Sequence, residues 1–128
     1  MKKDFSLSWK SSKQPRKQRK YRYNAPLHIK KKFVRSHLSK ELREKYKKRT
    51  VGLKKGDKVK IMRGKFKGKT GKVERIDVKR SRVYITGMEI IKKDGTKVLF
   101  PFEPSNLMIT ELNIDDKKRQ QILERKND

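Results

Sequence analysis

The sequence contains no cysteine, few acidic residues and little hydrophobic material. Without cysteine, disulfide bonds and thiolate metal sites are excluded. No apolar run approaches the ~20 residues needed to cross a bilayer, and residues 1–9 lack the continuous apolar segment of a signal peptide. Hydrophobic residues make up only 31% of the 128 positions, so a large core is not available. We therefore expect a small intracellular protein that does not associate with membranes.

What the sequence holds in excess is positive charge. Lys and Arg number 40 against 14 Asp and Glu, which gives a net charge of +26. The net charge is +16 over residues 1–50, +10 over residues 51–82 and zero over residues 83–128. Self-repulsion of this size disfavours a free compact state and points to an anionic partner. The asymmetry predicts one anion-binding side and one side that faces solvent or protein.

Residues 1–23 are predicted to form a basic extended arm. The segment is poor in aliphatic residues and is interrupted by Pro15, so we do not expect it to fold alone. Its aromatic residues Trp9, Tyr21 and Tyr23 are interleaved with charge, which suits stacking on unpaired bases or packing in a groove. A solvated tail or a nuclear-localisation-type basic cluster is the alternative interpretation.

Residues 51–112 are predicted to form a compact, mainly β domain. Short strands separated by turn residues favour a small barrel. The predicted strands are Lys58–Met62, Gly71–Lys79, Arg82–Thr86, Lys97–Phe102 and Asn106–Leu112. Asp94-Gly95 is a hairpin signal between two of them. The predicted core consists of Val59, Ile61, Val73, Ile76, Val78, Val83, Ile85, Ile90, Val98, Phe100, Leu107 and Ile109.

Short helices are predicted on both sides of this domain. Residues 24–50 are typical of two helices, the second beginning at the cap residue Ser39. Residues 113–128 are typical of one closing helix, capped by Asn113 or Asp115. Because isolated short helices are unstable, the first two must dock on the following domain, on RNA, or on both.

The most informative stretch runs from Gly56 to Val73 and reads G-D-K-V-K-I-M-R-G-K-F-K-G-K-T-G-K-V. It predicts a strand, a glycine-punctuated turn and a second strand. Glycines are expected where the backbone needs a positive φ or a close approach, here at Gly56, Gly64, Gly68 and Gly71. Four cations lie in or beside the turn, namely Arg63, Lys65, Lys67 and Lys69. This combination makes a surface suited to a polyanion.

The stretch resembles the KOW motif of SH3-like barrels in ribosomal and transcription proteins. Residues 24–50 and the ending I-L-E-R-K at residues 122–126 resemble the archaeal and eukaryotic form of a universal large-subunit ribosomal protein family. That family is called L twenty-four, or L twenty-six in eukaryotes. The chain lacks the long basic C-terminal tail expected of a eukaryotic member, so we expect an archaeal one.

The resemblance implies a non-enzymatic structural constituent of the large ribosomal subunit. Members of the family bind large-subunit ribosomal RNA near its 5′ end, assist early subunit assembly and lie near the peptide exit tunnel. The implied partners are this RNA and neighbouring large-subunit proteins in the cytoplasmic ribosome. No cofactor, small-molecule substrate or homo-oligomer is implied.

The resemblance also implies which residues contact RNA. In the KOW turn they are Arg63, Lys65, Phe66, Lys67 and Lys69, although Phe66 could instead cap the barrel core. In the arm they are Arg16, Lys17, Arg19, Lys20 and Arg22. On the helix faces they are Lys30, Lys31, Lys32 and Arg35.

Two other functions have weaker support. Gly68-Lys69-Thr70 resembles the end of a phosphate-binding loop, but the glycine spacing is one residue short and a strand follows instead of a helix. His28 and His37 are nine positions apart with no cysteine, so metal ligation is not expected. The stronger rival is a KOW-type transcription-elongation or other regulatory RNA-binding protein. Such factors usually carry a mixed α/β domain before the barrel, and residues 1–50 are too basic and too poor in apolar residues to form one.

Overall fold

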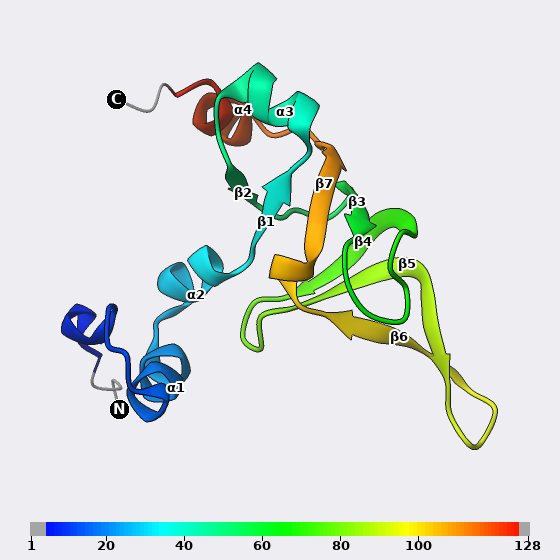
Figure 1. Cartoon of the computed structure of the whole chain (residues 1–128), viewed down its shortest axis with the longest axis horizontal. Coiled ribbons are helices and arrows are strands. Elements are labelled where there is room, and N and C mark those ends of the chain that lie inside the picture. Colours follow the sequence, from blue (N-terminus) through cyan, green and yellow to red (C-terminus); the bar gives the residue numbers. More distant parts are fainter. Residues whose placement is uncertain (1–4, 126–128) are drawn as a thin grey trace.

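The computed structural model describes residues 5–125 and shows a mainly β chain with short helices at both ends (Figure 1). One mixed sheet has the strand order β2-β1-β7-β3-β4-β5-β6, in agreement with the small barrel-like fold predicted. Neighbouring strands are antiparallel except β1 and β7, which run parallel. Residues 1–4 of the predicted arm and residues 126–128 of the predicted closing helix lie outside the described residues.

The elements follow one another in a simple order. The strands are β1 (Arg35–Leu38), β2 (Thr50–Gly52), β3 (Lys58–Ile61), β4 (Thr70–Asp77), β5 (Arg82–Ile91), β6 (Lys97–Phe102) and β7 (Leu107–Glu111). The helices are α1 (Pro15–Asn24), α2 (Leu27–Phe33), α3 (Lys40–Tyr46) and α4 (Lys117–Glu124), with 3-10 turns η1 (Leu7–Trp9) and η2 (Pro104–Asn106).

The main hydrophobic core is built from alternating positions of the central strands. Six side chains are fully buried there, as predicted, namely Val59, Ile61, Val83, Ile85, Leu107 and Ile109. Val73 is 2% exposed, and Ile76 and Phe100 pack on the core while partly buried. The period of two along each strand therefore identified the central part of the core correctly.

The β5–β6 hairpin is longer than the sequence predicts. Strand β5 continues past Thr86 to Ile91 because pairing resumes at Glu89 and Leu99 after an irregularity. The turn predicted at Asp94-Gly95 is present within a loop of residues 92–96. Because the hairpin extends away from the rest of the sheet (Figure 1), Val98 is 36% exposed. The prediction that Val98 lies in the core is therefore wrong.

Residues 15–24 form helix α1, so the prediction of an extended arm is wrong for this part of the chain. Pro15 is compatible with the helix because it occupies the first turn, where its missing N–H is not needed. Tyr21 packs with Ala25 and Ile29 in a second hydrophobic cluster, which is flanked by Phe5 and Phe33 and is called the Tyr21 cluster below. Side chains from three neighbouring segments bury one another there, which a local reading of the basic sequence does not anticipate.

Residues 24–50 contain the two predicted helices, α2 and α3, and also a strand that the sequence did not reveal. Strand β1 lies between them and pairs with β2 on one side and with β7 on the other. Ser36 is 1% exposed and its hydroxyl donates to the carbonyl oxygen of Pro104 at 2.6 Å. The strand is only four residues long, and β7 lies far along the chain from it, so no local pattern marks it.

A buried ion pair joins the beginning of the KOW stretch to helix α4. Asp57 is fully buried and Arg119 is 5% exposed. The guanidinium donates to both carboxylate oxygens at 2.5 Å, and it also donates to the carbonyl oxygens of Asn113 at 2.8 Å and Gly52 at 3.0 Å. The carboxylate accepts further bonds from the backbone N–H groups of Lys54 and Asn113. Within residues 5–125, no buried side-chain polar atom of the pair lacks a hydrogen-bond partner.

Helix α4 begins later than predicted and is capped by Asp116 instead of Asn113 or Asp115. The Asp116 carboxylate accepts from the Lys118 backbone N–H at 3.0 Å and also pairs with the Lys54 ammonium. The Lys54 hydrogen bond is the main cause that lowers the pKa of Asp116. A lowered folded-state pKa means that this carboxylate stabilises the fold above its unfolded pKa, and that the contribution is lost as pH falls through the folded pKa.

We predict that Arg119→Ala lowers the free energy of unfolding by about 3–5 kcal/mol, because it leaves a buried carboxylate without its partner. Arg119→Lys should recover only part of this loss, since an ammonium cannot form the bidentate contact. Urea denaturation followed by circular dichroism measures both. Arg125→Ala removes an exposed arginine after the same helix and should change stability by less than about 0.5 kcal/mol. Equal effects of the two Ala variants would refute a structural role for the pair.

Candidate nucleic-acid interface

The KOW loop, residues 62–69, connects β3 to β4 as a tightly closed turn. The N–H of Gly68 donates to the Ile61 carbonyl oxygen at 2.8 Å, and the N–H of Ile61 donates to the Lys69 carbonyl oxygen at 2.9 Å. Gly64 and Gly68 have φ values of 92° and 87°, in the left-handed region that favours glycine. No atom lies within 4 Å of an added Cβ at either position, so backbone conformation rather than lack of space requires glycine there.

Gly71 has a different role just after the loop. A Cβ at this position would lie 2.6 Å from Cγ2 of Ile85 and 3.2 Å from the carbonyl oxygen of Thr86. Glycine therefore allows β4 to approach β5 closely.

Phe66 lies in the core, which corrects the expectation that its ring contacts RNA. The residue is only 7% exposed. Its ring packs edge-on against Phe100 and Phe102, with centroid distances of 5.4 and 5.7 Å. The ammonium groups of Lys65 and Lys69 lie 5.9 and 5.3 Å from the ring centroid. The ring thus anchors the loop and supports its cations, and it does not offer a face for stacking.

The other predicted KOW residues remain on the surface. Arg63, Lys65, Lys67 and Lys69 are all exposed. Within residues 5–125, none of them forms an ion pair with an acidic side chain. The loop therefore presents uncompensated positive charge on a rigid support.

Helices α1 and α2 present most of the cations that the sequence assigned to the arm and helix faces. Arg35 is an exception, because it begins strand β1, so the prediction that it lies on a helix face is wrong. Exposed positions are Arg16, Arg19, Lys20, Arg22, Lys31, Lys32 and Arg35, while Lys17 and Lys30 are half-buried. Two of these cations lie over aromatic rings. The Lys17 ammonium is 3.9 Å from the Trp9 ring centroid, and the Arg22 guanidinium is 5.1 Å from that of Phe33.

A cationic groove forms where α1 and α2 meet the turn between β4 and β5. Its volume is about 340 Å³. Six cations line it, namely Arg19, Arg22, Lys30, Lys79, Arg80 and Arg82. One acid, Glu103, also lines it and is paired with Arg82. The exposed Tyr23 lies at the same groove. The groove therefore brings Arg19 and Arg22 of the predicted arm next to the β4–β5 turn, which the sequence did not predict as an RNA contact.

The cations of the β4–β5 turn are absent from the residues predicted to contact RNA. The signal that marks them in the sequence is the run K-R-S-R at residues 79–82, which lies outside the glycine-punctuated stretch. In the structure Ser81 adopts a positive φ of 53° at this turn, and the Arg80 N–H donates to the Asp77 carboxylate at 3.3 Å. This tight turn brings the three cations Lys79, Arg80 and Arg82 together at the groove.

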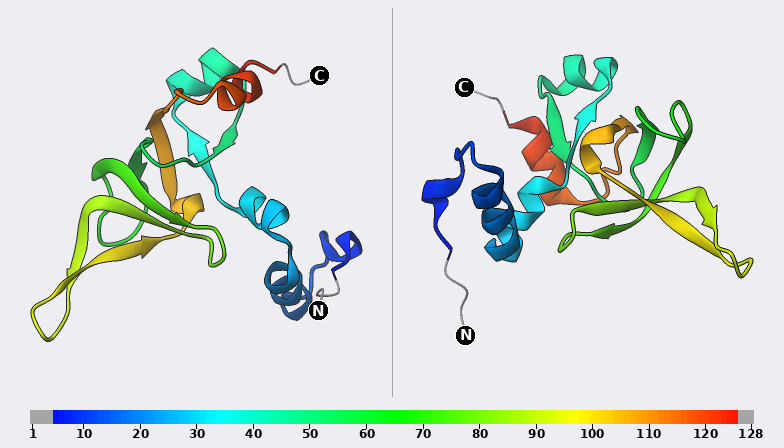
Figure 2. Two further views of the ribbon diagram at one scale, coloured as in Figure 1. Left: turned by 180° about the vertical axis from the view of Figure 1, so that it is seen from behind. Right: turned by 60° about the horizontal axis from the view of Figure 1, so that its bottom comes forward.

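The KOW loop does not belong to this groove. It lies on the other side of β7 from α1 and α2 (Figures 1 and 2). The tip of the β5–β6 hairpin lies at the end of the molecule opposite α1 (Figure 2). The predicted RNA-contacting residues therefore do not form one surface, because Arg19, Arg22 and Lys30 line the groove while the KOW cations lie apart from it.

The described residues offer little for other chemistry. Residues 5–125 contain no group of three or more His, Cys, Asp and Glu side chains placed to hold a metal ion. In the same range, no helix has the length and apolar content to cross a membrane. His37 contacts Arg43 at 3.3 Å through Nδ1, and His28 is exposed on α2.

Known proteins match this chain over most of its length. A family model of ribosomal proteins, called L26 in eukaryotes and L24 in archaea, matches residues 12–126. The large ribosomal subunit protein uL24 of Methanothrix thermoacetophila is 51% identical over 114 residues, which cover 89% of this chain and 98% of the relative. The protein of the same name from Methanosphaera stadtmanae is 49% identical over 115 residues, covering 90% and 98%.

The position of Phe66 yields a prediction about stability. Phe66→Ala should lower the free energy of unfolding by about 3 kcal/mol, because it removes a buried ring from the Phe100–Phe102 cluster. Lys67→Ala, at the exposed neighbouring position, should change it by less than about 0.5 kcal/mol. Urea titration of the two variants under identical salt provides the comparison. If Phe66→Ala unfolded at the wild-type midpoint, the ring would not be the anchor of the loop.

Proposed function

Because the chain belongs to the family of eukaryotic L26 and archaeal L24 ribosomal proteins, we propose that it binds large-subunit ribosomal RNA near the RNA's 5′ end. We further propose that it assists early subunit assembly and lies near the peptide exit tunnel beside neighbouring large-subunit proteins. The family assigns it a structural, non-enzymatic role in the large subunit of the cytoplasmic ribosome. The family predicted from the KOW stretch and its flanks is thereby confirmed.

The observation that supports RNA binding most directly is the cationic groove between α1, α2 and the β4–β5 turn. Among the residues that line the groove, only Arg82 is paired with an acid, so the remaining cations are available to phosphate oxygens. The helices that carry three of them are held in place by the Tyr21 cluster. Cations on a rigid support can bridge phosphates of adjacent RNA segments with little further ordering.

The KOW loop supplies a second contact in this proposal. Its exposed cations lie across β7 from the groove, so the two surfaces would contact different parts of a folded RNA. The proposed RNA contacts are the surface cations Arg16, Lys17, Arg19, Lys20, Arg22, Lys30, Lys31, Lys32, Arg35, Arg63, Lys65, Lys67 and Lys69. To these the groove adds Lys79 and Arg80.

The regulatory alternative has less support. A family model of ribosomal proteins spans residues 12–126. In the described chain, the part before the KOW stretch holds short helices and two short strands that belong to the main sheet, instead of a separate mixed α/β domain. Crosslinking in cells would separate the two functions. Crosslinks to the 5′ region of large-subunit RNA support the ribosomal role, whereas crosslinks confined to nascent messenger RNA would favour transcription.

The groove yields a prediction about salt dependence. In Lys79→Ala/Arg80→Ala, the slope of log K against log salt for a 5′ large-subunit RNA fragment should decrease by roughly 0.7–0.9 for each phosphate that the variant no longer neutralises. Lys92→Ala/Lys93→Ala removes the same charge at the hairpin loop, opposite the groove, and serves as the matched control. Filter binding over a salt series measures the slopes. Identical slopes for the two double variants would place RNA binding outside the groove.

The KOW loop yields a separate prediction. Replacing Arg63, Lys65, Lys67 and Lys69 together by Ala should weaken binding to the same fragment and decrease the salt slope further, since up to four phosphate contacts are removed. Thermal unfolding should stay near the wild-type midpoint because all four side chains are exposed. An unchanged affinity would mean that the helices and the groove carry the RNA contact without the loop.

A further inference from the structure

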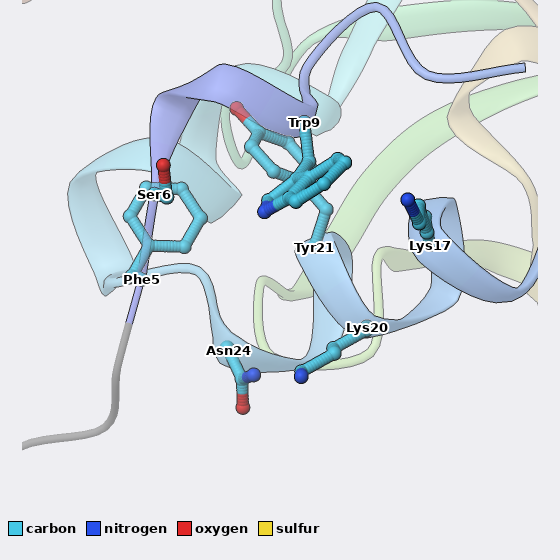
Figure 3. Close-up of a pocket in the computed structure, with 7 residues that line it drawn as sticks. All are labelled: Phe5, Ser6, Trp9, Lys17, Lys20, Tyr21 and Asn24. Atoms are coloured by element: carbon cyan, nitrogen blue, oxygen red, sulfur yellow. The ribbon is translucent and has the colours of Figure 1, made fainter.

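A cavity of about 610 Å³ lies between turn η1 and helix α1. Figure 3 shows the rings of Phe5 and Trp9 on one side of it and the side chains of Lys20 and Asn24 on the other. Tyr21 and Lys17 complete its lining. The cavity is separate from the cationic groove, since the two share no lining residue.

The aromatic lining is held in place by the fold. Tyr21 is only 8% exposed and its ring contacts that of Phe5, with centroids 5.0 Å apart. The side-chain amide of Gln18 donates to the carbonyl oxygens of Trp9, Lys10 and Ser12 at 3.4, 3.2 and 2.6 Å, which ties η1 and the residues after it to α1. The Trp9 side chain nevertheless remains 46% exposed. An exposed indole on an ordered backbone is therefore accessible to a ligand.

The polar groups of the cavity have the character of a nucleotide site. The Lys17 ammonium lies over one face of the Trp9 ring, 3.9 Å from its centroid, so a base would stack on the other face and its phosphates would lie close to this charge. Lys20 supplies a second ammonium, and the amide of Asn24 can both donate and accept hydrogen bonds. Aromatic faces next to cations are how proteins hold unstacked bases and their phosphates.

We propose that this cavity binds one unstacked nucleobase of RNA, stacked on Trp9, with neighbouring phosphates on Lys17 and Lys20. The proposal rests on the proposed function, which makes RNA the partner. It adds that the N-terminal segment recognises a single-stranded or bulged nucleotide in addition to backbone charge. A base inside a duplex cannot fill the site, because both of its faces are already covered by neighbouring bases.

Trp9 is the only tryptophan of the chain, so its fluorescence reports directly on the cavity. The full-length protein is titrated with a short oligoadenylate, with an abasic RNA oligomer of equal length and with a double-stranded RNA, and binding is followed in parallel by anisotropy. At equal saturation, the oligoadenylate should quench Trp9 and the other two should not. The oligoadenylate should also bind at least about five-fold more tightly than the abasic oligomer, in line with base–aromatic stacking.

Variants separate stacking from charge. Trp9→Ala should abolish the preference for oligoadenylate over the abasic oligomer, and Trp9→Phe should retain most of it. Lys17→Ala/Lys20→Ala should weaken both ligands. Leu7→Ala, which removes an exposed side chain of the same turn outside the cavity, should leave the preference unchanged. Circular dichroism confirms that each variant keeps its helix content.

Two results would overturn the cavity proposal while leaving RNA binding intact. One is equal quenching of Trp9 by the abasic or double-stranded ligand. The other is a preference for oligoadenylate that survives in Trp9→Ala. Failure of the wild-type protein to bind the 5′ large-subunit RNA fragment in the salt series would instead refute the proposed function itself.

Discussion

The buried contact between Asp57 and Arg119 joins segments of this small fold that lie far apart in the sequence. A carboxylate and a guanidinium can be buried in a protein only when each is fully paired, and here the pair reaches into four places along the chain. It bonds strand β2 through Gly52, the chain before β3 through Lys54, the chain after β7 through Asn113, and helix α4 itself. Asp57, which follows Gly56 at the start of the KOW stretch, therefore has a structural role. Its bonds to Arg119 hold helix α4 against the sheet.

A second constraint follows from composition. A chain with a net charge of +26 and 31% hydrophobic residues can bury few cations, and Arg119 is the buried cation of the described residues. The others must lie on the surface, where self-repulsion spreads them unless an anion holds them together. Six of them gather at the groove and four in the KOW loop, while residues 83–128 carry equal numbers of basic and acidic residues.

The sequence predicted well wherever the signal was local. The period of two located strands β3, β4, β6 and β7, the first half of β5 and the central core. Glycines located the KOW loop, and the flanking segments identified the family. It failed where contacts join distant segments. Strand β1 depends on pairing with β7, and helix α1 depends on Tyr21 meeting Phe5 and Phe33. The burial of Phe66 depends on two rings of β6. In each case the deciding partner lies outside the window in which periodicity can be read.

The helical state of residues 15–24 changes how the N-terminal segment can act on RNA. An extended arm would lose about 1–2 kcal/mol of backbone entropy for each residue ordered on binding, and much of its charge attraction would be offset by that loss. Here the Tyr21 cluster orders these residues when the protein folds, before any RNA is bound. Arg19 and Arg22 therefore reach the groove from a helix that is already ordered. The same ring is also a wall of the Trp9 cavity. One small hydrophobic cluster therefore orients both the cationic groove and the proposed base site, which lie on different sides of the same short helix.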